Sequence, residues 1–121
     1  MIYFISGHFD LTQEEFEEHY IPQLDKALSE KAGFIVCDCK GADSIAQKYL
    51  VGKSDNVLVY HMFEAPRNNC GFETLGGFKS DDDRDKSGTE DSDADIAWVR
   101  PGREKSGTAK NLKRRKNKKE E

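Results

Sequence analysis

The tetrapeptide Lys-Ser-Gly-Thr occurs twice in this chain, at residues 86–89 and 105–108, and the two copies have opposite surroundings. Backbone N–H groups at the start of a helix bind anions, and a glycine there lets a ligand approach closely. The first copy is flanked by aspartates and glutamates, which would repel a phosphate. The second copy follows a predicted strand and opens a predicted helix. We therefore predict a phosphate site at Ser106, Gly107 and Thr108, with Arg100, Arg103 and Lys105 nearby, and a plain helix cap as the alternative.

Two further segments follow predicted strands and carry polar residues. They are Gly7-His8-Phe9-Asp10 and Lys40-Gly41-Ala42-Asp43. Ligands collect at the carboxyl ends of parallel strands, so we expect both segments at one site, together with residues 64–80 after the third strand and residues 100–108 after the fourth. The predicted ligand contacts are Gly7, His8, Gly41, Ala42 and Asp43, with Arg84 as a fork for phosphate. The alternatives are that His8 is an ordinary loop residue and that Asp43 only caps a helix.

Carboxylates that could act in catalysis are present, but nothing singles one of them out. The candidates are Asp10, Asp43, Asp85 and Glu104. Cys37 and Cys39 alternate on a predicted strand and therefore face one side, yet no matching Cys or His pair accompanies them. We predict no metal and no cofactor. Whether the chain is an enzyme stays open at this point.

Apolar runs and capping signals alternate along the chain. Strands are expected over 2–6, 34–37, 56–63 and 94–99, and helices over 12–30, 43–50, 81–92 and from Thr108 onward. Thr12 and Glu15 form a capping box, and Pro22 either kinks the first helix or starts a second one. Residues 64–80 have no clear period, which predicts a long loop. This order indicates an α/β protein, a small Rossmann-like three-layer fold with a mostly parallel central sheet.

The segments ISGHFD, CKGADSIAQKYL, Arg84-Asp85 and SDADIAWVRPGREKSGTAKNL together resemble the SLOG superfamily. That superfamily includes DNA-processing protein A and the "Lonely guy" phosphoribohydrolases, and is distantly similar to nucleoside 2-deoxyribosyltransferases. The resemblance covers residues 2–115. It implies a domain that binds a nucleotide or a nucleotide-derived ligand, with Gly7 and residues 41–43 beside the ligand and Gly107-Thr108 at its phosphate.

The chain departs from the hydrolases of that superfamily at one position. They carry a catalytic glutamate three residues after the Gly-Thr pair, where this chain has Asn111, which cannot act as a carboxylate. We therefore expect a nucleotide-binding or sensor module first. An N-glycosidase that acts on a nucleoside or nucleotide through another carboxylate is the alternative.

The net charge of −4 conceals two regions of opposite sign. Residues 73–95 hold nine acidic and three basic side chains, whereas residues 100–121 hold ten basic and three acidic ones. We divide the chain into a domain at 1–112 and a basic, flexible tail at 113–121. A basic tail binds nucleic-acid backbones, which gives a second alternative function.

The cysteines and the lengths of the apolar runs indicate the cellular compartment that we expect for the protein. Three cysteines cannot all pair within the chain, and the beginning of the sequence does not resemble a signal peptide. The apolar stretches are far shorter than the roughly 20 residues that cross a bilayer. We expect an intracellular protein, in the cytoplasm or the nucleus, without a membrane partner. Uncovered faces on so small a sheet also predict a homodimer.

Overall fold

The computed structural model describes residues 1–120 and contains one sheet of five parallel strands, in the order β4-β3-β2-β1-β5. The strands are β1 (Ile2–Ile5), β2 (Gly33–Cys37), β3 (Val57–Met62), β4 (Glu73–Phe78) and β5 (Ala94–Ile96). The helices are α1 (Gln13–His19), α2 (Ile21–Ser29), α3 (Ala42–Leu50), α4 (Asp81–Glu90) and α5 (Gly107–Glu120). The predicted α/β, Rossmann-like fold is confirmed.

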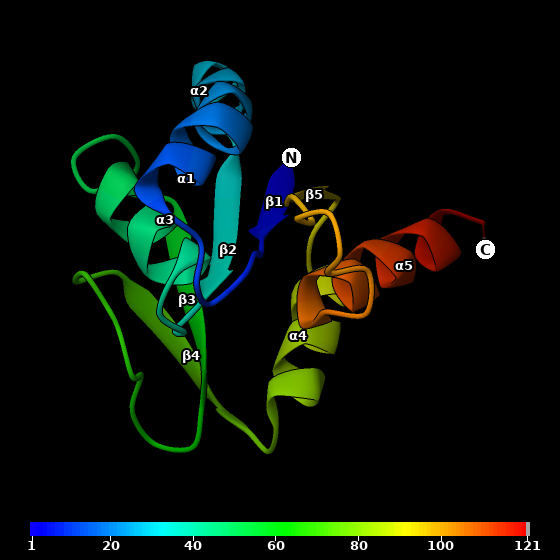
Figure 1. The fold of residues 1–121 in the computed structure, drawn as a ribbon. Helices are drawn as coiled ribbons and strands as arrows, with labels where there is room; N and C mark the ends of the chain where they lie inside the picture. The colour runs from blue at the N-terminus through cyan, green and yellow to red at the C-terminus, as the bar shows by residue number, and fades with distance from the viewer. Residues whose placement is uncertain (121) are drawn as a thin grey trace.

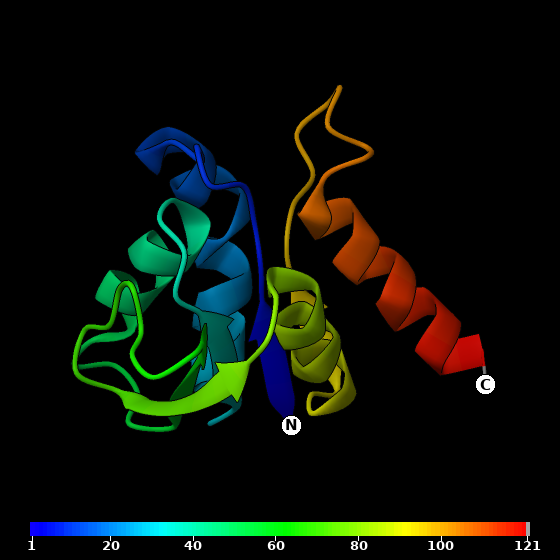
Figure 2. The ribbon, with the colours of Figure 1, turned by 90° about the horizontal axis from the view of Figure 1, so that it is seen from below.

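The helices cover the sheet in two separate layers. Figures 1 and 2 show α1, α2 and α3 on one side of β1 and β2, and α4 and α5 on the other. Each face of the sheet has its own apolar core. The larger core holds Phe16, Tyr20 and Leu24 against Ile5 and Val36, and the smaller one gathers Phe4, Ile35, Cys37 and Tyr60 under α4. Burial of both faces explains why β1 to β3 are apolar at nearly every position.

The predicted start of the first helix is confirmed in detail. The Thr12 hydroxyl accepts a hydrogen bond from Glu15 N, and the Glu15 carboxylate accepts one from Thr12 N. Tyr20 ends α1, and Pro22 lies in the first turn of α2. Backbone N–H groups in a first turn have no acceptor within the helix, so a proline there costs no hydrogen bond. Of the two roles predicted for Pro22, the start of a second helix is the one found.

The long loop predicted at 64–80 is wrong for its second half. Residues 73–78 form β4, the edge strand of the sheet, and nearly all of them are exposed. An exposed strand with two glycines shows none of the apolar alternation on which a strand prediction depends. The rest of the segment crosses over α3, where the Gln47 side chain donates to Asn68 O and accepts from Cys70 N.

The last strand is shorter than the sequence indicated, and the last helix includes residues that the sequence assigned to a tail. β5 ends at Ile96 rather than at residue 99, and Trp98 beyond it stacks on His19 with ring centroids 3.9 Å apart. Helix α5 continues through residues 113–120, which the sequence assigned to a tail, so the boundary predicted at 112 lies inside a helix. Within residues 1–120, each helix is too short or too polar to cross a membrane.

Candidate functional site

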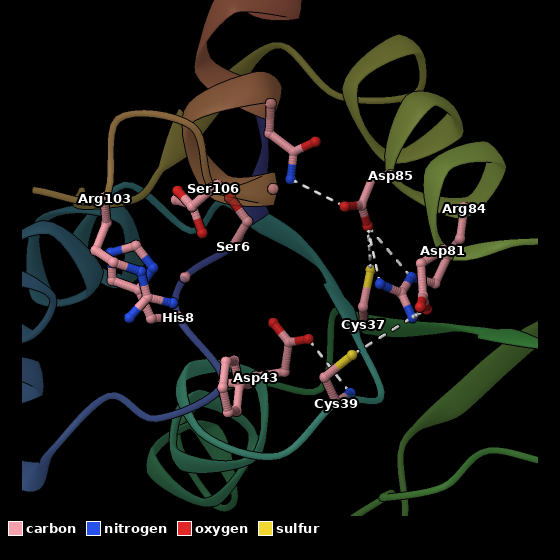
Figure 3. A pocket seen from close by; sticks show the side chains of 15 residues that line it. Ser6, His8, Cys37, Cys39, Asp43, Asp81, Arg84, Asp85, Arg103 and Ser106 are labelled. Carbon is pink, nitrogen blue, oxygen red and sulfur yellow. Dashed lines mark hydrogen bonds and ion pairs between the residues drawn. The ribbon is translucent and has the colours of Figure 1, made fainter. Parts of the chain in front are cut away.

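A cleft of about 280 Å³ opens at the carboxyl edge of the sheet, where the β1 and β2 loops meet α4 and the start of α5. Figure 3 shows side chains from these four segments turned toward it. The lining residues are Ser6, Gly7, His8, Phe9, Cys37, Cys39, Asp43, Asp81, Arg84, Asp85, Arg103, Ser106, Gly107, Thr108 and Asn111. The structure therefore brings together residues from three of the four segments that the parallel topology predicted to meet, and the fourth, residues 64–80, contributes no lining residue.

One side of the cleft is rich in hydrogen-bond donors. Ser106 caps α5, because its hydroxyl accepts from Ala109 N over 3.2 Å, which leaves its own proton free to donate. The N–H groups of Gly107 and Thr108 have no protein acceptor within residues 1–120. Ser6 is 6% exposed, and its hydroxyl has no partner in the same range. These groups, near the positive end of the α5 dipole, suit an anion.

The opposite side of the cleft holds Asp43, which does not cap α3 as its position suggested. The N-cap is Gly41, and the Asp43 carboxylate instead reaches back to accept from Cys39 N over 3.3 Å. Asp43 is 6% exposed. Burial raises its pKa to about 7, against a smaller opposing effect of Arg84 and with a further rise caused by Asp85. Asp43 therefore carries a proton near neutral pH for part of the time.

Asp85 reaches the cleft from α4 and joins its two walls. One of its oxygens accepts from the Arg84 guanidinium over 3.0 Å, and the Cys37 thiol is 3.6 Å from the same oxygen. Its other oxygen accepts from the Asn111 side-chain amide over 3.3 Å. Asn111, on α5, is 2% exposed. The position that holds a catalytic glutamate in the resembled hydrolases thus supports a carboxylate from another helix.

Arg84 is 3% exposed and already saturated by carboxylates. Its guanidinium contacts Asp38, Asp81 and Asp85 at 3.2, 2.7 and 3.0 Å. Burial alone would raise the pKa of Asp38, but hydrogen bonds from Arg67 lower it below its usual value. Arg84 lines the cleft as predicted, yet its bonds position acidic groups and leave little to offer a phosphate.

His8 lines the cleft and has one nitrogen committed to the fold. Its Nε2 accepts from Arg100 N over 2.9 Å, so the neutral ring carries its proton on Nδ1. Burial lowers the pKa of His8, and the positive charges of Arg103 and Arg100 lower it further. A neutral imidazole with a donating Nδ1 is therefore the form present at neutral pH.

Six predicted site residues lie outside the lining of the cleft, and one of them, Lys105, is an exposed surface residue. A Cβ on Gly41 would collide with the backbone of His8 and Phe9, and Ala42 N donates to His8 O over 3.1 Å, so both residues join α3 to the β1 loop. Arg100 binds Glu15 through two hydrogen bonds of 2.8 and 2.7 Å. The remaining two are surface carboxylates: Asp10 pairs with Arg100 and Arg103, and Glu104 accepts from Gly102 N.

The sequence reasoning did not select several residues that line the cleft. Cys37 and Cys39 were expected to face one side, which the structure confirms, but no role was attached to them. Burial raises the pKa of both thiols, so they are poor nucleophiles. Phe9 is 56% exposed, with Lys40 Nζ 5.5 Å from its ring centroid. Ser6 could have been predicted as a site residue, because it is a polar residue that directly follows an apolar run.

Within residues 1–120, no three His, Cys, Asp or Glu side chains converge as ligands of a metal ion would. No family model, curated protein or solved structure matches this chain.

Proposed function

We propose that this protein binds a nucleotide or a nucleotide-derived ligand in the cleft, with a phosphate at the N-terminus of α5. The observation that carries the proposal is that Gly107 and Thr108 line the cleft and that their N–H groups have no protein acceptor within residues 1–120. The unpartnered hydroxyl of Ser6 lies in the same lining, and Arg103 adds positive charge. Such groups recognise a phosphate through hydrogen bonds and the helix dipole together.

The two sides of the cleft fit the two polar parts of a nucleotide. Donors gather around Gly107, whereas the Asp43 carboxyl on the other side can accept hydrogen bonds from sugar hydroxyls. A volume of about 280 Å³ lies near the lower end of the roughly 300–1,000 Å³ of typical ligand pockets. A ligand with one nucleoside unit therefore fits better than a dinucleotide. The resemblance to the SLOG superfamily supports the same class of ligand.

The test is calorimetric titration with a panel of nucleoside monophosphates and ADP-ribose. Gly107→Asp places a carboxylate where the phosphate would bind, and we expect it to abolish binding. The substitution introduces an acidic residue into the first turn of α5, which favours the helix, so the fold should persist. Gln13→Asp makes the same charge change in the first turn of α1 and should leave binding intact. Equal affinities for the two variants would refute the proposed site.

N-glycosidic cleavage is the second candidate, favoured by the buried carboxyl of Asp43. A pKa of about 7 suits a group that donates a proton to a departing base, while Asp85 lies across the cleft with its carboxylate paired to Arg84. Water would then add to the sugar carbon that loses the base. Incubation with each nucleotide and chromatography for free base tests this activity. Release that persists in Asp43→Asn would exclude the assigned role.

Nucleic-acid binding through the basic segment has weaker support than the sequence suggested. The Arg115 guanidinium pairs with Asp95 at 3.1 Å, and Lys118 Nζ donates to Glu90 O at 3.0 Å, so part of the positive charge is used inside the fold. Lys113 and Lys116 remain exposed. Anisotropy of a labelled oligonucleotide, measured with Lys113→Gln and Lys116→Gln combined, tests whether these lysines bind a backbone.

A further inference from the structure

A second hollow of about 380 Å³ lies between α4 and α5 and shares no lining residue with the cleft. Its walls are Lys86, Thr89, Glu90, Arg114, Asn117 and Lys118, and we refer to it as the α4–α5 groove. In Figure 2 the two helices lie together on the side of β1 away from α1 and α2, and α5 diverges from α4 toward its C-terminal end. The first copy of the Lys-Ser-Gly-Thr tetrapeptide contributes two of the walls, Lys86 and Thr89.

The groove presents hydrogen-bond donors that the fold does not use. Thr89 is 3% exposed, and its hydroxyl oxygen has no hydrogen-bond partner within residues 1–120. In the same range, the Lys86 ammonium and the Asn117 amide also form no hydrogen bond or ion pair. A buried hydroxyl without a partner is costly unless a ligand or water satisfies it. These groups indicate a site for a molecule with several acceptor oxygens.

The charge around the groove is positive, with three cations against the single carboxylate of Glu90. Lys118 Nζ donates to the carbonyl oxygens of Thr89, Glu90 and Ser92 at 3.2, 3.0 and 3.0 Å. These bonds satisfy the last carbonyls of α4, whose partial negative charge would otherwise repel an anion. Lys86 is then available to contact the anion itself, and Arg114 does so by exchanging its pairing with Asp82.

Four of the acidic neighbours that argued against a phosphate at this tetrapeptide have partners away from the groove, whereas Asp82 pairs with Arg114 at its wall and Glu90 lines it. Asp81 and Asp85 turn toward Arg84, on the side of the cleft. Asp91 accepts from the Tyr60 hydroxyl over 2.6 Å, and Asp93 accepts from Ile2 N over 2.8 Å. A count of charges along the chain cannot show that α5 brings Arg114 and Lys118 beside Lys86.

We propose that the α4–α5 groove is a second anion site, which takes a small phosphate-bearing molecule. Lys86 and Arg114 pair with its charge, and Thr89 and Asn117 donate hydrogen bonds to its oxygens. The enclosure by two helices favours a small molecule over the backbone of a nucleic acid.

Arg114 connects the groove to the cleft. Its Nη1 donates to Asn111 Oδ1 over 2.6 Å, and the Asn111 amide donates onward to Asp85. Its Nη2 contacts Asp82. An anion in the groove competes for the same guanidinium, so occupancy changes how Asn111 is held and thereby the carboxylate in the cleft. The regulatory meaning of this connection rests on the proposed function of the cleft, whereas the anion site itself does not.

Pyrophosphate added to the ¹⁵N-labelled full chain at constant ionic strength tests the site by nuclear magnetic resonance. We expect saturable shifts at the Thr89 amide and the Asn117 side chain, followed by the Asn111 side chain. Lys86→Gln should weaken pyrophosphate binding about tenfold, since it removes one charge-assisted contact. Lys113→Gln makes the same charge change on the exposed face of α5 and should leave the affinity unchanged.

The other possible results of this titration either refute or support the anion site in the groove. If Lys86→Gln and Lys113→Gln lowered the affinity for pyrophosphate equally, binding would reflect general charge attraction, and the proposed anion site would be refuted. Shifts confined to Gly107 and Thr108 would also overturn it, while leaving the cleft proposal standing. Shifts at Thr89 and Asn117 that persist in Gly107→Asp would support the groove even if nucleotides fail to bind. A short oligonucleotide that displaces pyrophosphate from Thr89 would replace the small-molecule assignment by a nucleic-acid surface.

Discussion

The Asn111 side-chain amide, on α5, donates a hydrogen bond to the Asp85 carboxylate, on α4, over 3.3 Å. This bond explains how the chain keeps a carboxylate in the cleft although α5 carries an amide. The acidic group comes from α4, and Asn111 and Arg84 hold it from two sides. An amide at position 111 therefore does not leave this part of the cleft without an acidic group.

The buried carboxyl of Asp43 should make the protein less stable as the pH rises. Its pKa is about 7 in the folded state against 3.8 as the ordinary value, so the folded state binds the proton more tightly. The resulting stabilisation is complete below about pH 4 and is lost as the pH rises through 7. Asp43→Asn cannot titrate and retains an oxygen for Cys39 N. At pH 8 we expect it to be more stable than the wild type by about 2 to 4 kcal/mol.

Urea denaturation of both proteins at pH 4.5, 6 and 8 measures this difference, because groups that do not interact with Asp43 contribute equally to both. A difference that stays constant over this range would contradict a raised pKa for Asp43.

Glu15 should contribute to stability with the opposite dependence on pH. Hydrogen bonds from Arg100, and then from Thr12 N, lower its pKa to about 2 from an ordinary value of 4.5. A lowered pKa in the folded state gives stabilisation that is present above pH 4.5 and is lost as the pH falls through 2. The advantage of the wild type over Glu15→Gln in urea should therefore shrink between pH 5 and pH 2.5. A difference between the two proteins that stays constant over this range would contradict the lowered pKa of Glu15.

Much of this architecture was accessible from the sequence because it depends on local pattern. Strands β1 to β3 are buried on both faces, so their apolar runs are unambiguous, and the Thr12 capping box is a contact between near neighbours. Strand β4 was not accessible, because an exposed edge strand has no apolar pattern to detect.

The candidate site was predictable in position but only partly in residue roles. Parallel topology alone places the loops after β1, β2 and β5 at one edge. The partners of individual charges depend on contacts far apart in the chain. Arg100 was predicted at a phosphate, but Glu15, 85 residues away, binds it instead. Asp43 was predicted as a ligand contact, with a helix cap as the alternative; it lines the cleft and does not cap α3, and its raised pKa depends on burial by several elements.

The basic residues beyond 112 should be needed for stability, because α5 is part of the domain. Arg115, 6% exposed, donates to Ser92 O over 2.9 Å and pairs with Asp95 at 3.1 Å. Its removal leaves the buried Asp95 carboxylate without its cation, at a cost of about 3 to 5 kcal/mol. Arg115→Met and truncation after residue 112 should both lower the urea midpoint strongly. Lys116→Met, at an exposed position, should change the unfolding free energy by about 0.5 kcal/mol or less. If the truncated protein were as stable as the full chain, this prediction would be wrong, and the division into a domain at 1–112 and a tail would be supported instead.

The two glycines of the repeated tetrapeptide should respond in opposite ways to one identical substitution. A Cβ on Gly88 would lie 2.5 Å from a ring carbon of Phe4, which is completely buried and has no room to move. Gly88→Ala should therefore cost about 1 to 3 kcal/mol through overpacking, which exceeds the gain of under about 1 kcal/mol in helix propensity. A Cβ on Gly107 meets nothing within 4 Å, so Gly107→Ala should be neutral or slightly stabilising. Thermal or urea unfolding of the two variants measures the difference. Equal effects would mean that α4 does not pack on Phe4 as described, since only the tertiary surroundings distinguish the two copies.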